Sequence, residues 1–309
     1  MPIPAPAALQ GLTVLERGWL SSNNVLLHGQ GAGAVLVDSG HVLHGTQTLA
    51  LLRTAVDGEP LARIVNTHLH SDHCGGNALL QRSLGCSITV PPGGWAAARD
   101  WDETALSYRA TGQRCERFRP DEVLAPGQSI DGGGRSWQAL AAPGHDPDSI
   151  MLFDARHGVL ISADALWEHG FGVVFPELEG ESAFDDVEQV LDLIERLDVR
   201  WVIPGHGAPF DDAVGALHRA RQRLAAFRAD PTRHARHGIK VMIKYHLMEE
   251  RQQTWPDFEA WFGATPLCQA VWQRLGCPDG TMAQFGQRLL HDLERGGAVL
   301  VRDGVLHDA

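Results

Sequence analysis

Short apolar runs separated by polar and glycine-rich turns occupy the first two-thirds of the chain, and this pattern predicts a succession of β-strands. The first group of predicted strands covers residues 12–16, 24–28, 34–38, 63–66 and 87–91. The second group covers residues 122–124, 128–130, 137–142, 150–154, 159–162 and 201–203. Apolar residues at helical spacing predict helices over 44–56, 77–84 and 183–197. We therefore expect a mixed, layered α/β fold, with two related sheets that face each other.

The last third of the chain changes character, from short strands to helices. Residues 218–244 are helical in pattern and basic. Shorter helices are predicted over 255–262, 266–275 and 282–295, and a small hairpin over 298–301 and 304–306. This change predicts two domains, residues 1–215 and residues 216–309.

A dense cluster of metal-ligand side chains follows the strand at 63–66. It consists of His68, His70, Asp72 and His73, within six consecutive positions. His68 and His70 are two apart, so on extended backbone their side chains point to the same face. A single histidine near a strand end is usually a hydrogen-bonded residue, but nothing structural requires several costly polar groups at one strand end. The cluster therefore predicts a metal site, with a metal-free polar cluster as the alternative.

Three further polar residues follow predicted strands in the second group. His145 comes after Pro143-Gly144, Asp164 follows the run 159–162, and His206 comes after Pro204-Gly205. Each alone is weak evidence, because a histidine in such a loop is usually just solvated. The repetition indicates that short strands from both halves deliver their ligands to one shared edge of the sheets.

Composition and charge narrow the class of protein. The chain has 309 residues, a formal net charge of −12 and a pI near 5.7, which disfavours a general nucleic-acid binder that would need a basic face. No apolar run approaches the ~18 residues that a membrane span needs, and residues 1–6 show no secretory leader. The five cysteines form no CxxC pair, which favours reduced thiols and a cytoplasmic location.

The ordered set of seven histidines and aspartates resembles the metallo-β-lactamase-fold hydrolase superfamily over roughly residues 10–210. The resemblance implies a four-layer αββα sandwich with a binuclear metal site at the sheet edge. It also implies a division of ligands: His68, His70 and His145 for one metal, Asp72, His73 and His206 for the second, and Asp164 bridging both. This ligand set is more similar to that of glyoxalase II than to that of true β-lactamases. Zinc is the family's usual metal, and iron and manganese also occupy such sites.

The chemistry that the resemblance implies is hydrolysis by a metal-bound hydroxide, with Asp72 fixing the second metal and orienting the hydroxide. We expect a small-molecule substrate with an ester, thioester, lactone or related bond. Trp167, His169 and Phe171 follow Asp164 and are candidate substrate contacts. No convincing set of basic residues is present for the carboxylates of glutathione. Asp146 and Asp148 have two interpretations, as partners that orient a ligand imidazole or as solvated turn acids.

The C-terminal region leaves three interpretations open. Helices followed by a terminal hairpin resemble the winged-helix-like tail of some superfamily members, so the fold class is an αββα sandwich with a mainly helical, winged-helix-like C-terminal domain. Because some such relatives cleave RNA, the alternative function is a metal-dependent nuclease or phosphodiesterase whose basic region binds RNA or DNA. In a third interpretation the tail forms a homodimer or a lid. A member that has lost its ligands is disfavoured, because all seven positions are filled.

Overall fold

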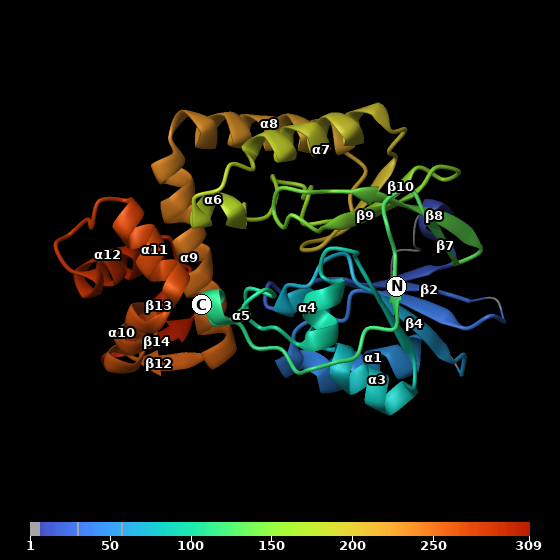
Figure 1. Cartoon of the computed structure of the whole chain (residues 1–309), viewed down its shortest axis with the longest axis horizontal. Helices are drawn as coiled ribbons and strands as arrows, with labels where there is room; N and C mark the ends of the chain where they lie inside the picture. The colour runs from blue at the N-terminus through green and yellow to red at the C-terminus, as the bar shows by residue number, and fades with distance from the viewer. Residues whose placement is uncertain (1–6, 30, 57) are drawn as a thin grey trace.

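Two β-sheets form the centre of the molecule, and the computed structural model describes residues 7–29, 31–56 and 58–309 (Figure 1). Residues 1–6 lie outside the described residues. The sequence predicts no secretory leader in this segment. The first sheet has the order β1-β2-β3-β4-β5-β6, with β3 to β6 parallel to one another. Its strands are β1 (Leu12–Leu15), β2 (Asn24–Leu27), β3 (Ala34–Val37), β4 (Leu61–Val65), β5 (Ser87–Val90) and β6 (Glu122–Val123).

The second sheet has the order β11-β10-β9-β8-β7 and is antiparallel except for its last pair, β10 and β11. Its strands are β7 (Ser129–Gly132), β8 (Arg135–Ala141), β9 (Ile150–Asp154), β10 (Val159–Ala163) and β11 (Trp201–Pro204). A helical crossover joins the parallel pair, as parallel strands require. The predicted division of the strands into two groups is confirmed except for residues 122–124. These were predicted with the second group, but β6 pairs with β5 at the edge of the first sheet.

Helices cover the outer face of each sheet and complete four layers (Figure 1). The first sheet is covered by α1 (Gly45–Ala55) and α3 (Asn77–Leu84), and the second by α7 (Phe184–Arg196) and α8 (Ala213–Ala229). A short helical turn, η1 (Ala7–Leu9), precedes β1. Others lie in the connections: η2 (Val42–His44), α2 (Ser71–Cys74), α4 (Trp95–Asp100), α5 (Tyr108–Thr111) and α6 (Phe175–Glu179). The predicted αββα sandwich is confirmed.

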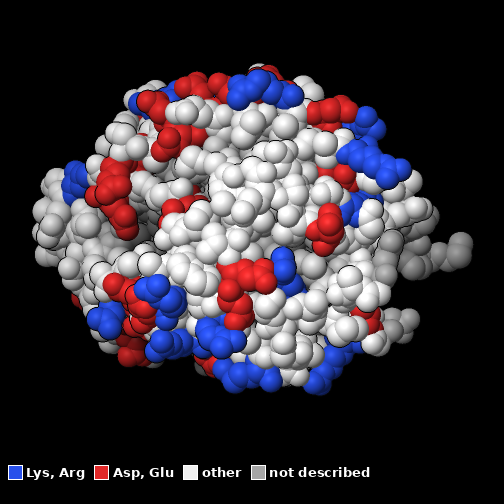
Figure 2. Space-filling model, turned by 45° about the vertical axis from the view of Figure 1, so that its right-hand side comes forward, with Lys and Arg blue, Asp and Glu red and all other residues white. Residues whose placement is uncertain are grey.

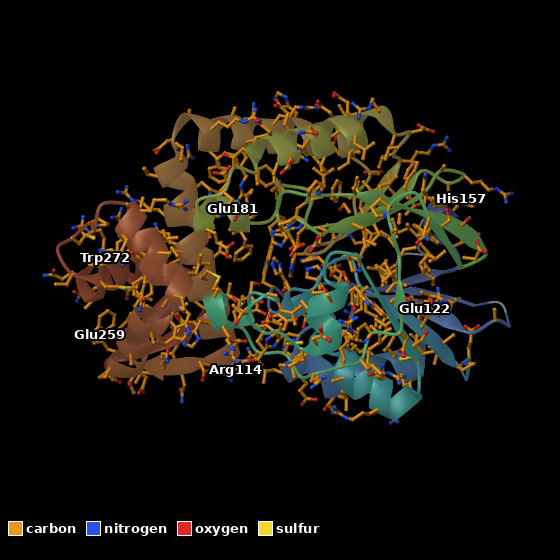
Figure 3. All side chains as sticks on the ribbon, viewed as in Figure 1. Arg114, Glu122, His157, Glu181, Glu259 and Trp272 are labelled. Carbon is orange, nitrogen blue, oxygen red and sulfur yellow. The ribbon has the colours of Figure 1, made fainter. Side chains whose placement is uncertain are left out.

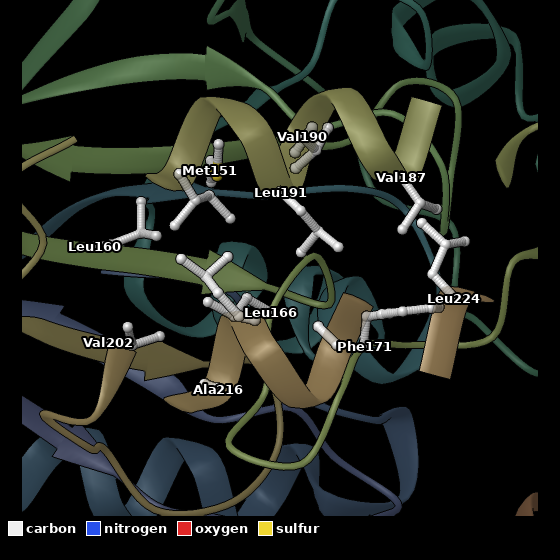
Figure 4. Close-up of a cluster of buried hydrophobic side chains, with 14 of the residues drawn as sticks. Met151, Leu160, Leu166, Phe171, Val187, Val190, Leu191, Val202, Ala216 and Leu224 are labelled. Atoms are coloured by element: carbon white, nitrogen blue, oxygen red, sulfur yellow. The ribbon is translucent and has the colours of Figure 1, made fainter. Parts of the chain in front are cut away.

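The amphipathic helix α7 shows why the layers hold together. Val187, Val190, Leu191 and Ile194 recur at helical spacing and are buried. They pack against side chains of the second sheet and of α8, among them Leu160 (Figure 4). Burial of a whole aliphatic side chain contributes about 1.5–3 kcal/mol, so this face fixes α7 on the sheet.

The basic stretch 218–244 is divided between two helices, which corrects the prediction of one helical segment. Helix α8 ends at Ala229, and α9 (Pro231–Glu250) begins directly after Asp230. Proline at the first helical position lacks an N–H, and the Asp230 carboxylate accepts hydrogen bonds from the backbone N–H groups of Thr232 and Arg233. The Asp-Pro pair therefore stops one helix and starts the next.

The remainder of the chain forms a helical unit with a small sheet of order β12-β14-β13. Its elements are β12 (Gln252–Thr254), α10 (Trp255–Ala264), α11 (Pro266–Arg274), α12 (Met282–Arg295), β13 (Val299–Arg302) and β14 (Val305–Asp308). The predicted hairpin is confirmed, and β12 is a strand that the sequence pattern did not predict. A winged-helix identity for this unit stays a prediction.

The two parts of the chain share packing. The proposed boundary between residues 215 and 216 falls inside α8, which packs on α7, so the division into domains stays a prediction. The hydrophobic core of the C-terminal helices also takes in Val173 and Leu178 from the sandwich. No helix in the described part of the chain is both long and apolar enough to cross a membrane.

Buried His234 joins α9 to the sandwich and makes stability depend on pH. Its Nε2 accepts a hydrogen bond of 3.2 Å from the backbone N–H of Val174, and its ring lies against the rings of Phe184 and Phe227. Burial, followed by the charge of nearby His237, lowers the pKa of His234 to about 3. The unfolded chain binds a proton near its ordinary pKa of about 6.5, so stability falls as the pH drops from about 6.5 toward 3.

We expect His234→Gln to reduce this pH dependence, because glutamine keeps an acceptor and does not titrate. One histidine contributes at most about 1.4 kcal/mol per pH unit to the slope of the unfolding free energy. The measurement is denaturant unfolding at pH 7.5 and at pH 5.5. His169→Gln is the matched control, because the His169 side chain is 79% exposed. An equal loss of stability on acidification in the wild type and in His234→Gln would contradict the assignment.

Candidate metal centre

The seven predicted ligand residues lie together at one edge of the two sheets, in two groups. His68, His70 and His145 form the first group, and the second consists of Asp72, His73, Asp164 and His206. Within each group, the ligand atoms all lie within 4.8 Å of one another. All seven residues are buried. Segments from both halves of the chain therefore build one polar centre, as the sequence predicted.

Three ring nitrogens converge in the first group. His68 Nε2 lies 3.1 Å from His70 Nδ1, which lies 2.8 Å from His145 Nε2. The opposite nitrogen of His145, Nδ1, donates a 2.6 Å hydrogen bond to the carbonyl oxygen of Val173, so its Nε2 carries a free lone pair. Three imidazole nitrogens that face one point match the protein part of a tetrahedral site.

Burial keeps these three imidazoles neutral. It lowers the pKa of His70 and of His145 to about 4, and that of His68 well below the usual value. Neutral imidazole is the form that binds metals. The group is therefore ready to act as a ligand set at neutral pH.

Local backbone geometry aims these side chains. His68 and His70 follow β4, and extended backbone at His70 (φ −65°, ψ 149°) keeps the two side chains on one side. His145 follows β8 in a turn through Gly144, which has φ +129°. A Cβ on Gly144 would lie 2.6 Å from a methyl group of Val187, so only glycine fits between β8 and α7.

The second group contains a buried nitrogen without a hydrogen-bond partner. His73 Nδ1 donates a 2.8 Å hydrogen bond to Asp38 Oδ2, whereas Nε2 of the same ring has no partner among the described residues. That Nε2 lies 3.7 Å from Asp72 Oδ2, which is 3.0 Å from His206 Nε2. Burial by itself would lower the pKa of His73, but the charges of Asp38, Asp164 and Asp72 raise it well above the usual value, so without a cation the ring takes up a proton. A metal ion would replace that proton on Nε2, which otherwise has no partner in the described part of the chain, and would neutralise the carboxylates of Asp72 and Asp164. The residues present therefore fit a metal ion.

Asp164 lies between the two groups. Its Oδ2 is 3.3 Å from His145 Nε2 and 3.5 Å from His73 Nε2. Burial by itself would raise the pKa of the Asp164 carboxyl, but the charges of His73 and its neighbours lower the pKa well below the usual value. An ionised carboxylate in this position can bind a cation in either group.

Asp38 is a supporting residue for which the sequence analysis assigned no role. Its Oδ1 accepts the backbone N–H of Thr67, and its Oδ2 accepts from the Thr67 hydroxyl as well as from His73. Asp38 sits at the end of β3 with φ +58°, at the same sheet edge as the ligands. The rule that a polar residue after a strand faces this edge, applied to β3, would have identified it.

The predicted substrate contacts lie in different environments. Trp167 is half-buried beside the centre, and its indole N–H donates a 3.2 Å hydrogen bond to Asp164 Oδ1. His169 is exposed, next to Glu168. Phe171 is 2% exposed and packs in the core under α7 and α8 (Figure 4). Their contact with a substrate stays a prediction. Of the three, Trp167 is the one that contacts a predicted ligand, Asp164.

Both interpretations of Asp146 find support. Its Oδ2 lies 3.7 Å from His70 Nε2, the ring nitrogen that faces away from the three-imidazole group, as an orienting residue would. Its Oδ1 accepts a 2.8 Å hydrogen bond from the backbone N–H of Asp148, as in a turn. The same carboxylate closes the turn and faces the ligand ring.

A cavity of about 240 Å³ opens beside the three-imidazole group. His68, His70 and His145 form part of its wall. Four carboxylates also line it, those of Asp146, Asp148, Glu179 and Glu181, and Figure 3 labels Glu181 beside α6. Its described lining contains no lysine or arginine. The space next to the centre is therefore acidic.

Comparisons with known proteins agree with this geometry. A family model described as "Metallo-beta-lactamase superfamily" matches residues 17–206. A hydroxyacylglutathione hydrolase from Anaeromyxobacter dehalogenans is 30% identical over 221 residues, which cover 69% of this chain and 75% of that protein. An acyl-coenzyme A thioesterase from Gallus gallus is 29% identical over 157 residues, 46% of this chain and 55% of its own length.

A solved structure shares the fold over nearly the whole chain. It is a metallo-beta-lactamase family protein from Thermus thermophilus, with a TM-score of 0.58 and 22% sequence identity. The alignment covers 98% of this chain and 100% of that one. At 22% sequence identity, this similarity establishes a shared fold and no shared function.

Because the ligands fall into two groups, a variant in one group should lose the metal ion of that group alone. We expect about two equivalents of zinc per chain in the wild type and about one in His68→Ala and in His206→Ala, because each variant removes a ligand from one group. Elemental analysis after dialysis against trace zinc measures the content. His169→Ala is the control, since that side chain is exposed. Full metal content in both ligand variants would contradict the grouping.

Proposed function

This chain belongs to the metallo-β-lactamase superfamily and is a hydrolase of that superfamily, and we propose that it uses two metal ions to cut a small-molecule ester, thioester or lactone. The observation that carries the proposal is the place of Asp164 Oδ2, within 3.5 Å of a histidine nitrogen from each group. A carboxylate so placed suits two cations that share one ligand.

The seven residues would form two metal sites that share one ligand. His68, His70 and His145 would hold one ion, Asp72, His73 and His206 the other, and Asp164 both. Zinc is the ion that we propose, and the nitrogen and oxygen donors also suit iron or manganese. When bound, such ions supply Lewis acidity and activate water near neutral pH.

Neighbouring residues of the chain keep this centre oriented. Asp38 fixes the tautomer of His73 by accepting from Nδ1, and the Val173 carbonyl does the same for His145. Burial alone would raise the pKa of Asp72, but the charge of His73 and the contact with His206 lower it well below the usual value. Ionised Asp72 accepts a hydrogen bond from the attacking water. This hydrogen bond orients the water so that a lone pair of its oxygen faces the substrate carbonyl carbon.

The charge of the cavity narrows the substrate class. Glutathione and coenzyme A, named in two relatives, are carriers with several anionic groups. None of the described lysines or arginines lies within 4.0 Å of the carboxylates of Asp146, Asp148, Glu179 or Glu181, so a polyanionic carrier would meet like charge there. We therefore propose a small acyl substrate whose leaving group is neutral or cationic.

The nucleic-acid alternative gains no support from the basic stretch. Most of its cations are paired with acids of the same chain, and Lys and Arg alternate with Asp and Glu over the face shown in Figure 2. The pairs are Arg219 with Asp212, Arg221 with Asp192 and Glu195, Arg228 with Asp185 and Glu188, Lys240 with Asp292, and Lys244 with Asp308. Cations already neutralised release few counterions from phosphates.

We expect the zinc-loaded protein to hydrolyse ester, thioester or lactone bonds, and Asp164→Asn to lose at least about 100-fold in kcat/KM, because the shared ligand is weakened. A panel of acyl substrates, with phosphodiesters and β-lactams beside them, measures the reaction class. Circular dichroism controls for the fold of the variant. Cleavage of phosphodiesters alone would replace this proposal by the nuclease.

If the acidic cavity selects the substrate, the enzyme should distinguish thioesters that carry the same acyl group on neutral and on anionic thiol carriers. We expect wild-type protein to prefer a neutral N-acetylcysteamine thioester over the same acyl group on coenzyme A. Removing a like charge about 4 Å away is worth about 1 kcal/mol in water, so Glu179→Gln with Glu181→Gln should improve the relative kcat/KM for acyl-coenzyme A about fivefold or more. Glu259→Gln, on α10, is the control (Figure 3). Equal selectivity in all three proteins would contradict the role of the cavity charge.

A further inference from the structure

We propose that helix α9 of the C-terminal region is a structural part of the metal centre, with Tyr245 and Glu249 as positioning residues for the ligand-bearing turn α2. The inference rests on the proposed metal centre. It assigns a role to a helix that supplies no ligand of its own. Its basis is a pair of contacts, one at each end of α2.

The first contact reaches the start of α2. Tyr245 Oη and Ser71 Oγ are 2.7 Å apart, although the residues are 174 positions apart in the chain. Ser71 is fully buried and stands between the predicted ligands His70 and Asp72. Its backbone N–H donates to Gln113 Oε1, so its hydroxyl is the group through which α9 holds this turn.

The second contact is made one helical turn further along α9. Glu249 Oε1 lies 2.9 Å from His41 Nε2, and their side chains are only 2% and 0% exposed. His41 Nδ1 accepts from the backbone N–H of Leu43, so Nε2 carries the proton and donates it to the Glu249 carboxylate. Removing one partner of such a buried pair leaves a polar group unsatisfied.

His41 transmits this contact to the other end of α2. The backbone N–H of Gly76 donates to the carbonyl oxygen of Gly40, and a Cβ on Gly75 would lie 2.5 Å from the nitrogen of Val42. The segment around His41 therefore packs directly on the end of α2. Helix α9 holds the turn at its start through Tyr245 and at its end through Glu249.

The spacing on α9 makes the two contacts one unit. Residues 245 and 249 are four positions apart and lie on the same helix face. The Tyr245 ring also meets the His41 ring edge to face, with centroids 5.7 Å apart. Because α2 carries Asp72 and His73, a shift of α9 moves two ligands of the second group together.

The experiment measures metal binding rather than turnover. We expect Tyr245→Phe and Glu249→Gln each to weaken zinc binding about tenfold, as loss of groups that orient ligands typically does. Competition with a chromophoric chelator gives the dissociation constants. The visible spectrum of the cobalt-loaded protein reports the ligand geometry of both groups, which a change in overall stability would not alter.

Two controls separate the outcomes. Lys240→Gln removes a polar contact that α9 makes with Asp292 of α12, among the C-terminal helices, and should leave zinc binding unchanged. Ser71→Ala should weaken binding as much as Tyr245→Phe does, and the double variant no more than either. Wild-type affinity and spectrum in Tyr245→Phe and Glu249→Gln would overturn the inference and leave the metal centre standing. A wild type that binds no zinc would overturn both.

Discussion

The structure depends on the burial of five imidazoles and two carboxylates at one edge of two sheets. Seven polar side chains in so small a volume are costly unless each has a partner. Protein groups accept hydrogen bonds from two of the outward-facing ring nitrogens, Asp38 from His73 and the Val173 carbonyl from His145. The inward-facing nitrogens converge on two points and, in His73, lack a protein partner. The arrangement is therefore a site for cations and makes little sense as a core.

The sandwich supplies the rigidity that such a site needs. Each ligand follows a strand or short turn whose backbone is fixed by sheet hydrogen bonds and by an outer helix. Gly144 and Gly205 permit close approaches at the ligands, since a Cβ on Gly205 would lie 2.1 Å from Asp164 Oδ1. In our inference, helix α9 extends this support from the C-terminal region. Three parts of the fold would then position the candidate metal centre.

In the proposed function, catalysis and selection of the substrate reside in different residues. The buried ligands would hold the ions that activate water, and membership of a superfamily of hydrolases agrees with that chemistry. The carboxylates that line the cavity come from two loops and α6, and in our proposal their charge selects the acyl carrier. A fold that hosts hydrolases of anionic thioesters can therefore serve a different substrate when the charge of this wall changes.

The sequence was enough to predict most of the layers and to select the seven histidines and aspartates that the fold brings together. Strand alternation and helical periodicity are local properties, and a polar residue after an apolar strand reports the sheet edge wherever it occurs. The tertiary structure alone decided which supports meet the ligands. Tyr245 and Glu249 read as ordinary helix residues, and their partners lie 174 and 208 positions away. The acidic cavity likewise brings together Asp146 and Glu181, which lie in different loops. Contacts of this kind depend on how helices and loops far apart in the chain pack together, and the local pattern of apolar and polar residues does not show that packing.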